Sequence, residues 1–145
     1  MNDRFFLDTN IFVYSFGPLS SHKTEGADFL ITQALVTGKG VISYQVVQEF
    51  YNVAFRRFPE PMRGEDAEQF LSTVLRPLWV VHSSPALCIK ALQILERFRL
   101  QWYDALIVAG AIEAKCGILY SEDFQNGQRF DDLQVRNPFL PAGGG

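Results

Sequence analysis

Four acidic residues are spaced along the chain in a pattern that suits metal binding. Asp8 and Asp123 each follow a short apolar run, whereas Glu49 and Asp104 fall in segments with helical periodicity, at successive intervals of 41, 55 and 19 residues. Carboxylate oxygens are the ligands that Mg²⁺ and Mn²⁺ prefer. If folding brings the four carboxylates together, they can hold one or two such ions. The sequence has no Cys/His cluster, which argues against zinc.

Two of these positions, Asp8 and Asp104, also have an ordinary interpretation at helix starts. Asp8, Thr9 and Asn10 follow a strand-like run, and residues of these types are frequent in turns and at helix N-termini. Asp104 near a helix start complements the helix dipole. Capping therefore remains the alternative at these positions.

Glu49 has a different alternative, a buried salt bridge. Val46, Phe50 and Val53 define the apolar stripe of its predicted helix, and Glu49 lies on the flank of that stripe. A carboxylate in such a place needs a partner, which is either a cation of the protein or a bound metal ion.

The elements that must position these residues alternate between strand-like and helical segments, which is typical of a parallel α/β sheet. Strands are expected at residues 4–8, 40–43, 78–82 and 117–121, with a weaker one at 133–136. Helices are expected at residues 22–37, 45–57, 64–76, 86–99 and 103–116. Right-handed crossovers put helices on both faces of such a sheet, and ligands bind beyond the carboxyl ends of its strands. Asp8 and Asp123 are expected at that edge.

Local signals support two of the helix boundaries. Ser84 is a suitable N-cap, and Pro85 suits the first helical position of the 86–99 segment. Gly117 is the expected C′ glycine that stops the 103–116 helix. Both helices therefore have defined ends.

The segments that carry the acidic residues resemble those of the PIN-domain nucleases, in order and in spacing. The resemblance rests on residues 7–11, 48–50, 103–107 and 120–124, so it covers nearly the whole chain. The chain length and the run 121–127 are similar to the VapC-type toxins of toxin–antitoxin pairs. The resemblance implies a PIN-like, doubly wound sheet of four to five mainly parallel strands with helices on both faces.

The resemblance also implies an activity, a cofactor and partners. The activity is a Mg²⁺- or Mn²⁺-dependent endoribonuclease that uses one or two ions and leaves a 5′-phosphate. Asp8 and Asp104 are expected to contact the metal directly, and Glu49 and Asp123 directly or through water. A homodimer and inhibition by a small VapB-type antitoxin are further implications.

The fourth acidic position is ambiguous because Glu122 and Asp123 are adjacent. Side chains alternate along a strand, so Ser121 and Asp123 share a face. The family pattern, with a hydroxyl residue two positions before the acid, favours Asp123 and leaves Glu122 as a solvated side chain. Thr9, Asn10 and Ser121 are candidates for holding the carboxylates or their waters.

Contacts to RNA have weaker support. Arg56 lies two helical turns after Glu49, and Arg129 and Arg136 are expected near the acidic edge, so all three are candidates for binding phosphate. For Arg56 the favoured alternative is that it complements the dipole of a helix end. Trp102 and Tyr103 are suited to stacking on a base, although aromatic residues beside a helix start are more often part of the core.

The composition predicts one compact domain over residues 1–140, with residues 141–145 as a flexible tail. The 145 residues are 48% hydrophobic, and the net charge of −3 argues against RNA binding through bulk positive charge. Cys88 and Cys116 are expected to be reduced thiols in the core. The N-terminus has no signal-peptide pattern and no segment suits a membrane span, so a cytoplasmic protein is expected.

Two other functions fit part of the pattern. One is a PIN-like module without catalysis that binds RNA or protein through the same surface. The other is a haloacid-dehalogenase-like phosphohydrolase, which also begins with an aspartate at a strand end; residues 8–10 lack the second aspartate of that motif.

Overall fold

The computed structural model describes residues 3–140. The predicted tail at residues 141–145 lies outside them. The strands are β1 (Phe5–Leu7), β2 (Gly40–Ser43), β3 (Trp79–Val81), β4 (Ile118–Tyr120), β5 (Arg129–Phe130) and β6 (Leu133–Arg136). The helices are α1 (Thr9–Tyr14), α2 (His22–Thr37), α3 (Tyr44–Arg56), α4 (Gly64–Phe70), α5 (Arg76–Leu78), α6 (Pro85–Phe98) and α7 (Trp102–Glu113), with a π-helical turn at Leu71–Leu75.

The six strands form one sheet in the order β3-β2-β1-β4-β6-β5, and all neighbouring pairs are parallel except β5 and β6. The five predicted strands are present, and β5 is additional. β5 is two residues long and turns tightly into β6 through Asp131, whose φ is +57°. A strand of two residues has too little alternation to be recognised in a sequence.

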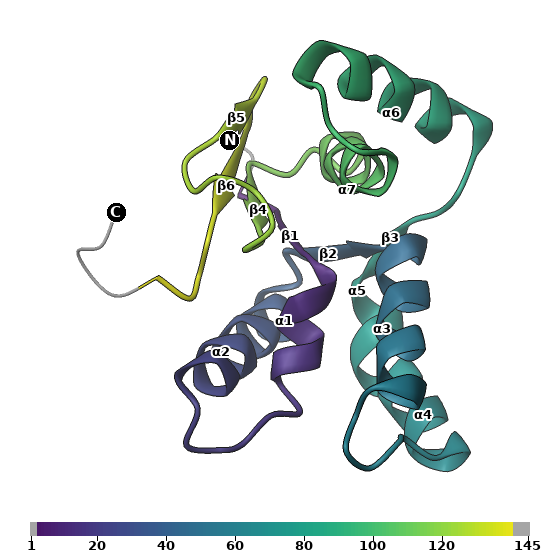
Figure 1. Ribbon diagram of the computed structural model, residues 1–145, viewed down its shortest axis with the longest axis vertical. Helices are drawn as coiled ribbons and strands as arrows, with labels where there is room; N and C mark the ends of the chain where they lie inside the picture. The colour runs from purple at the N-terminus through teal and green to yellow at the C-terminus, as the bar shows by residue number, and fades with distance from the viewer. Residues whose placement is uncertain (1–2, 141–145) are drawn as a thin grey trace.

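Helices cover both faces of the sheet, as expected. Figure 1 shows α6 and α7 on one face and α1, α2 and α3 on the other. Fully buried aromatic and aliphatic side chains fill the space between the layers, among them Phe6, Phe12, Phe50 and Leu119. This core fixes the directions in which the carboxyl ends of β1 and β4 present their following residues.

Gly40 shows how closely the layers approach. A Cβ atom at this position would lie 2.1 Å from the Cβ of Ala34 on α2, which is far inside van der Waals contact. Glycine is therefore required where β2 begins beneath α2.

One of the two predicted helix ends is confirmed and the other is wrong. The Ser84 hydroxyl accepts from the N–H of Leu87 at 3.0 Å and caps α6, with Pro85 at the first helical position. Helix α7 ends at Glu113, before the predicted boundary, and Lys115 takes the left-handed conformation with φ +59°. Gly117 instead donates its N–H to Arg4 and already leads into β4.

The two cysteines differ, which corrects the prediction that both are core thiols. Cys116 is buried, but Cys88 is exposed. Helix α6 turns Leu87, Ala91 and Ile94 towards the core. Because successive helical residues are rotated by about 100°, Cys88 faces away from that stripe.

Within residues 3–140, none of the helices combines the length and the hydropathy that spanning a bilayer requires.

Candidate active site

Asp8 occupies the centre of the carboxyl edge, at the junction of β1 and α1. It is the N-cap of α1, and its Oδ1 accepts the N–H of Thr9 at 2.7 Å. Its Oδ2 accepts the hydroxyl of Ser121 at 2.6 Å, and the residue is only 5% exposed. The capping interpretation is thus correct for Asp8, yet the residue is buried more deeply than a cap requires.

Ser121 connects Asp8 to Asp123. Besides donating to Asp8, its Oγ accepts the N–H of Asp123 at 3.1 Å. The N–H of Asp8 in turn donates to the carbonyl of Tyr120 at 3.1 Å. The ends of β1 and β4 are therefore joined by hydrogen bonds, and the loop that carries Asp123 starts from a fixed point.

Glu49 reaches the same edge from α3. The hydroxyl of Thr9 donates to its Oε1 at 2.8 Å. None of the ion pairs within residues 3–140 involves Glu49, so the salt-bridge alternative is not found there. The buried stripe of α3 consists of Val46, Val47, Phe50 and Ala54, and Val53, which was expected to be buried, is partly exposed.

Asp104 lies in the first turn of α7. The N-cap of this helix is Gln101, so Asp104 is not the capping residue, although its place in the first turn still suits the helix dipole. The side chain is partly buried, and this burial raises the pKa of its carboxyl group.

The four carboxylates are coupled electrostatically. Burial raises the pKa of Asp8 to about 7, against the hydrogen bonds from Ser121 and Thr9, and the charges of Asp123 and Glu49 raise it further. Burial likewise raises the pKa of Asp123, with Glu122 and Asp104 adding to the shift. The carboxylate of Asp8 is thus repelled by those of Glu49 and Asp123. The carboxylate of Asp123 is also repelled by that of Asp104.

These carboxylates have no cationic partner in the part of the chain that the structure describes. The ion pairs there are Lys23–Glu122, Lys39–Asp3 and Arg97–Asp131. An oxygen-only donor set with uncompensated negative charge suits a hard divalent cation. Among residues 3–140, however, no group of three His, Cys, Asp or Glu side chains is arranged to hold one ion. The chemistry of the donors fits a metal ion, and the arrangement supplies fewer than three protein ligands to any one position.

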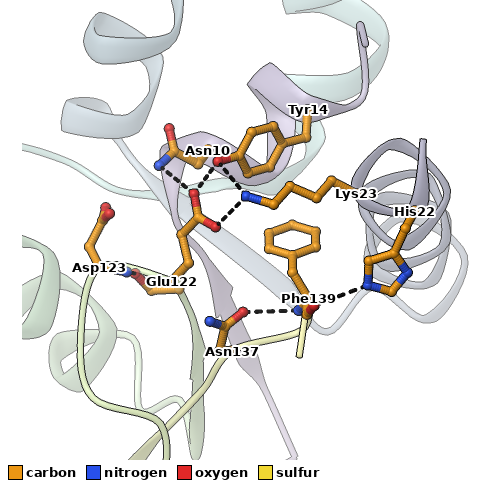
Figure 2. Close-up of polar contacts among 9 residues, drawn as sticks. Asn10, Tyr14, His22, Lys23, Glu122, Asp123, Asn137 and Phe139 are labelled. Atoms are coloured by element: carbon orange, nitrogen blue, oxygen red, sulfur yellow. Dashed lines mark hydrogen bonds and ion pairs between the residues drawn. The ribbon is translucent and has the colours of Figure 1, made fainter. Parts of the chain in front are cut away.

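Glu122 has a different environment, which corrects the expectation that it is a solvated side chain. Its carboxylate pairs with Lys23 Nζ at 3.1 Å and accepts hydrogen bonds from Tyr14 and, at 3.4 Å, from Asn10. Figure 2 shows Glu122 pointing towards these three residues, whereas the side chain of Asp123 points away from them. Asn10 therefore supports Glu122, and of the two adjacent acids Asp123 is the one that has no counterion within residues 3–140.

The sequence model of the PIN domain family matches residues 5–132. The chain belongs to the PIN domain family. Comparison with curated proteins yields no match.

Solved structures with the same fold include a toxin–antitoxin complex and a toxin. A toxin–antitoxin complex from Klebsiella pneumoniae is 19% identical, with a TM-score of 0.64, and the alignment covers 92% of this chain and 96% of that one. FitAB bound to a DNA fragment is 16% identical, with a TM-score of 0.70, and the alignment covers 94% of this chain and 96% of that one. VapC20 of Mycobacterium tuberculosis, described as a sarcin–ricin loop cleaving toxin, is 20% identical, with a TM-score of 0.59. The alignment covers 83% of this chain and 91% of that one. The predicted fold class and the resemblance to PIN-domain proteins are confirmed.

In this PIN domain, the arginines that are candidates for binding RNA lie at different distances from the carboxyl edge of the sheet. Arg136 pairs in register with Tyr120, at the carboxyl edge. Arg129 pairs with Gln134, which is level with the start of β4, and Arg56 is exposed in the last turn of α3. Arg136 is thus the one whose backbone lies level with the acidic edge, and phosphate binding by Arg56 and Arg129 remains a prediction.

Proposed function

We propose that this PIN domain is a metal-dependent endoribonuclease and the toxin component of a VapBC-type toxin–antitoxin pair. The observation that carries the proposal is a set of coupled carboxylates at one edge of the sheet, which have no counterion among the described residues: Asp8, Glu49, Asp104 and Asp123. Family membership supports nuclease chemistry, and the folds of toxin–antitoxin proteins support the biological role.

Asp8 and Asp104 would hold a Mg²⁺ or Mn²⁺ ion directly, and Glu49 and Asp123 directly or through water. When bound there, a divalent ion would supply a water molecule of lowered pKa and positive charge opposite the departing 3′ oxygen. The N–H of Thr9 and the hydroxyl of Ser121 orient the two oxygens of Asp8. The hydroxyl of Thr9 orients Glu49.

These residues suit hydrolysis of a phosphodiester. The water oxygen bonds to phosphorus, the bond from phosphorus to the 3′ oxygen breaks, and the proton released by the water passes to solvent while the 3′ oxygen takes one up. The products are a 5′-phosphate and a 3′-hydroxyl. One or two ions satisfy this scheme, because Mg²⁺ commonly keeps waters and substrate oxygens among its ligands.

The proposed partners are RNA, a small VapB-type antitoxin and a second copy of the chain. RNA as the substrate implies action in the cytoplasm. The antitoxin is proposed because the Klebsiella pneumoniae structure is of a toxin–antitoxin complex. Light scattering of the purified protein tests the homodimer.

Cleavage of structured RNA by the purified protein tests the activity. We expect cleavage with Mg²⁺ or Mn²⁺, none with EDTA, and at least about 100-fold slower cleavage by Asp8→Asn and Asp104→Asn, because second-sphere residues alone contribute about 10–100-fold to metal sites. Asp132→Asn, an exposed acid in the turn before β6, is the matched control.

Two outcomes would contradict the proposal. Equal cleavage by the wild type and Asp8→Asn would identify a contaminating nuclease. Binding of RNA or protein without any cleavage would favour the alternative of a PIN-like module that does not catalyse a reaction.

A further inference from the structure

A cleft opens at the carboxyl edge of the sheet, beside the acidic residues. It has a volume of about 130 Å³ and lies where β2 and β3 end and where α3, α6 and α7 begin. The side chains that matter here are Gln48, His82, Ser83, Cys88 and Tyr103. Clefts for drug-sized ligands measure about 300–1,000 Å³, so this one accommodates a single planar ring system.

Aromatic stacking makes the wall of the cleft rigid. Tyr44 stacks on Trp79 with centroids 5.6 Å apart and planes 11° apart, and the centroid of the His82 ring lies 5.5 Å from that of Trp79. The side chain of Gln45 donates to the carbonyl of Tyr103 at 3.0 Å, which joins the first turns of α3 and α7. The cleft is therefore formed before any ligand arrives.

The groups around the cleft are free to bind a ligand. Tyr103 is 65% exposed, an unusual state for a large aromatic side chain. Within residues 3–140, the side chains of Gln48 and His82 make no hydrogen bond. An aromatic face beside unused amide and imidazole groups is the chemistry that binds an unpaired nucleobase, by stacking and by hydrogen bonds to its edge.

The cleft lies beside the acidic residues because residues next to them in α3 and α7 line it. On α3, Gln48 lines the cleft and Glu49 is the next residue; on α7, Tyr103 lines it and Asp104 is next. Neighbouring strands lie about 4.8 Å apart, so the ends of β2 and β3 lie one and two strand spacings from the end of β1, where Asp8 is located. The cleft thus lies within reach of a nucleotide next to a phosphate at Asp8.

We infer that this cleft binds one unpaired base of the RNA substrate, next to the phosphate that is cut, with Tyr103 stacking on the base and Gln48 and His82 contacting its edge. The inference rests on the proposed function and adds a determinant of base preference. Among residues 3–140, no lysine or arginine lines the cleft, so it suits a base and not a phosphate.

Substitution of Tyr103 tests the stacking contact. We expect Tyr103→Ala to raise KM about 5- to 100-fold, the range for loss of one stacked base, to leave kcat within about threefold, and to relax the base preference mapped beside the cleavage site. Tyr103→Phe keeps the ring and should retain both. Phe29→Ala removes a similarly exposed ring, at 63%, from α2 and is the matched control.

Cys88 provides a probe that does not depend on catalysis. It is exposed in the lining of the cleft, whereas Cys116 is buried, so N-ethylmaleimide should modify Cys88 selectively. In the Asp8→Asn variant, saturating single-stranded RNA should slow this modification at least fivefold, as measured by mass spectrometry. Duplex RNA of the same sequence should protect less, because its bases are paired.

The possible failures can be told apart. If the wild type cleaves RNA but Tyr103→Ala behaves like Phe29→Ala and Cys88 is not protected, the base site is wrong and the proposed function stands. If a protein partner protects Cys88 and RNA does not, the cleft is a protein contact and the inference is overturned. If the wild type neither cleaves nor binds RNA, the proposed function itself fails.

Discussion

Glu122 and Asp123 are neighbours in the chain but lie in opposite electrostatic environments. Glu122 is paired with Lys23 and accepts hydrogen bonds from Tyr14 and Asn10 (Figure 2). Asp123 faces Asp104 and Asp8 and has no counterion among the described residues. Within two residues, the chain holds one carboxylate whose charge it balances and one whose charge it does not.

The difference separates structural acids from candidate metal ligands. An acid with its own cation contributes to stability without any ligand, although an exposed pair contributes little. Clustered carboxylates repel by about 3 kcal/mol per pair at 5 Å and an effective dielectric of 20. A fold keeps such a cluster at a cost in stability, which a bound cation offsets. The uncompensated acids are therefore the ones to expect at an active site.

The largest expected effect is that of Asp8→Asn on stability. Without metal, this variant should be about 1–3 kcal/mol more stable than the wild type at pH 8, because it removes a buried charge beside Asp123 and Glu49. The amide can still accept from Thr9 and donate to Ser121. Mg²⁺ at 100 times its Kd should stabilise the wild type by about 2.7 kcal/mol and the variant much less. Urea unfolding with and without Mg²⁺ measures both.

Asp132→Asn is the control for this experiment and should keep the full response to Mg²⁺. An equal response of the wild type and Asp8→Asn would mean that Asp8 is not at the metal site.

The pH dependence of the metal-free protein should follow the same charge. The pKa of Asp8 is raised from 3.8 to about 7 on folding, so the folded state binds this proton more tightly than the unfolded state. Its contribution to stability is complete below about pH 4 and is lost as the pH rises to about 7. The stability advantage of Asp8→Asn should therefore grow across this window and level off above it. A stability difference between Asp8→Asn and the wild type that stays constant from pH 4 to 8 would contradict the raised pKa of Asp8.

A smaller effect is expected in the balanced region. Lys23→Met keeps the apolar stem but removes the ammonium group 3.1 Å from Glu122 and 4.5 Å from the centre of the Tyr14 ring. Because half-exposed pairs are weak, thermal unfolding should show a loss of about 1 kcal/mol. The response to Mg²⁺ should remain, since Glu122 is not among the proposed ligands.

Lys39→Met removes the cation of the more exposed pair with Asp3 and should leave stability unchanged. If Lys23→Met abolished the response to Mg²⁺ while Lys39→Met did not, the two environments would not be independent, and Glu122 would have to be included in the site.

Much of the fold could be predicted from local patterns. The alternation of short apolar runs with helical segments indicated the five longer strands, and Ser84 with Pro85 marked the start of α6. The features that could not be predicted, strand β5 and the end of α7, lack such a signal. Strand β5 is too short to alternate, and nothing local showed that Lys115 takes the left-handed conformation so that Gly117 can lead into β4.

The candidate site could be predicted in part. The placement of Asp8 and Ser121 at one edge follows from parallel strands, because their carboxyl ends meet there. Cys88 was misplaced because apolar neighbours in the sequence do not show which face of α6 a single residue occupies. The aromatic cleft beside Tyr103 could not be foreseen either, since three helices from distant parts of the chain form it.

The sequence alone determined the order of the elements and the residues that follow each strand, because periodicity and turn signals act between near neighbours. Only the tertiary structure decided which acids carry a counterion. Lys23 reaches Glu122 across 99 residues of chain, and Ser121 reaches Asp8 across 113. Charge balance in a folded protein depends on such distances in space, and residue type and order do not encode them directly.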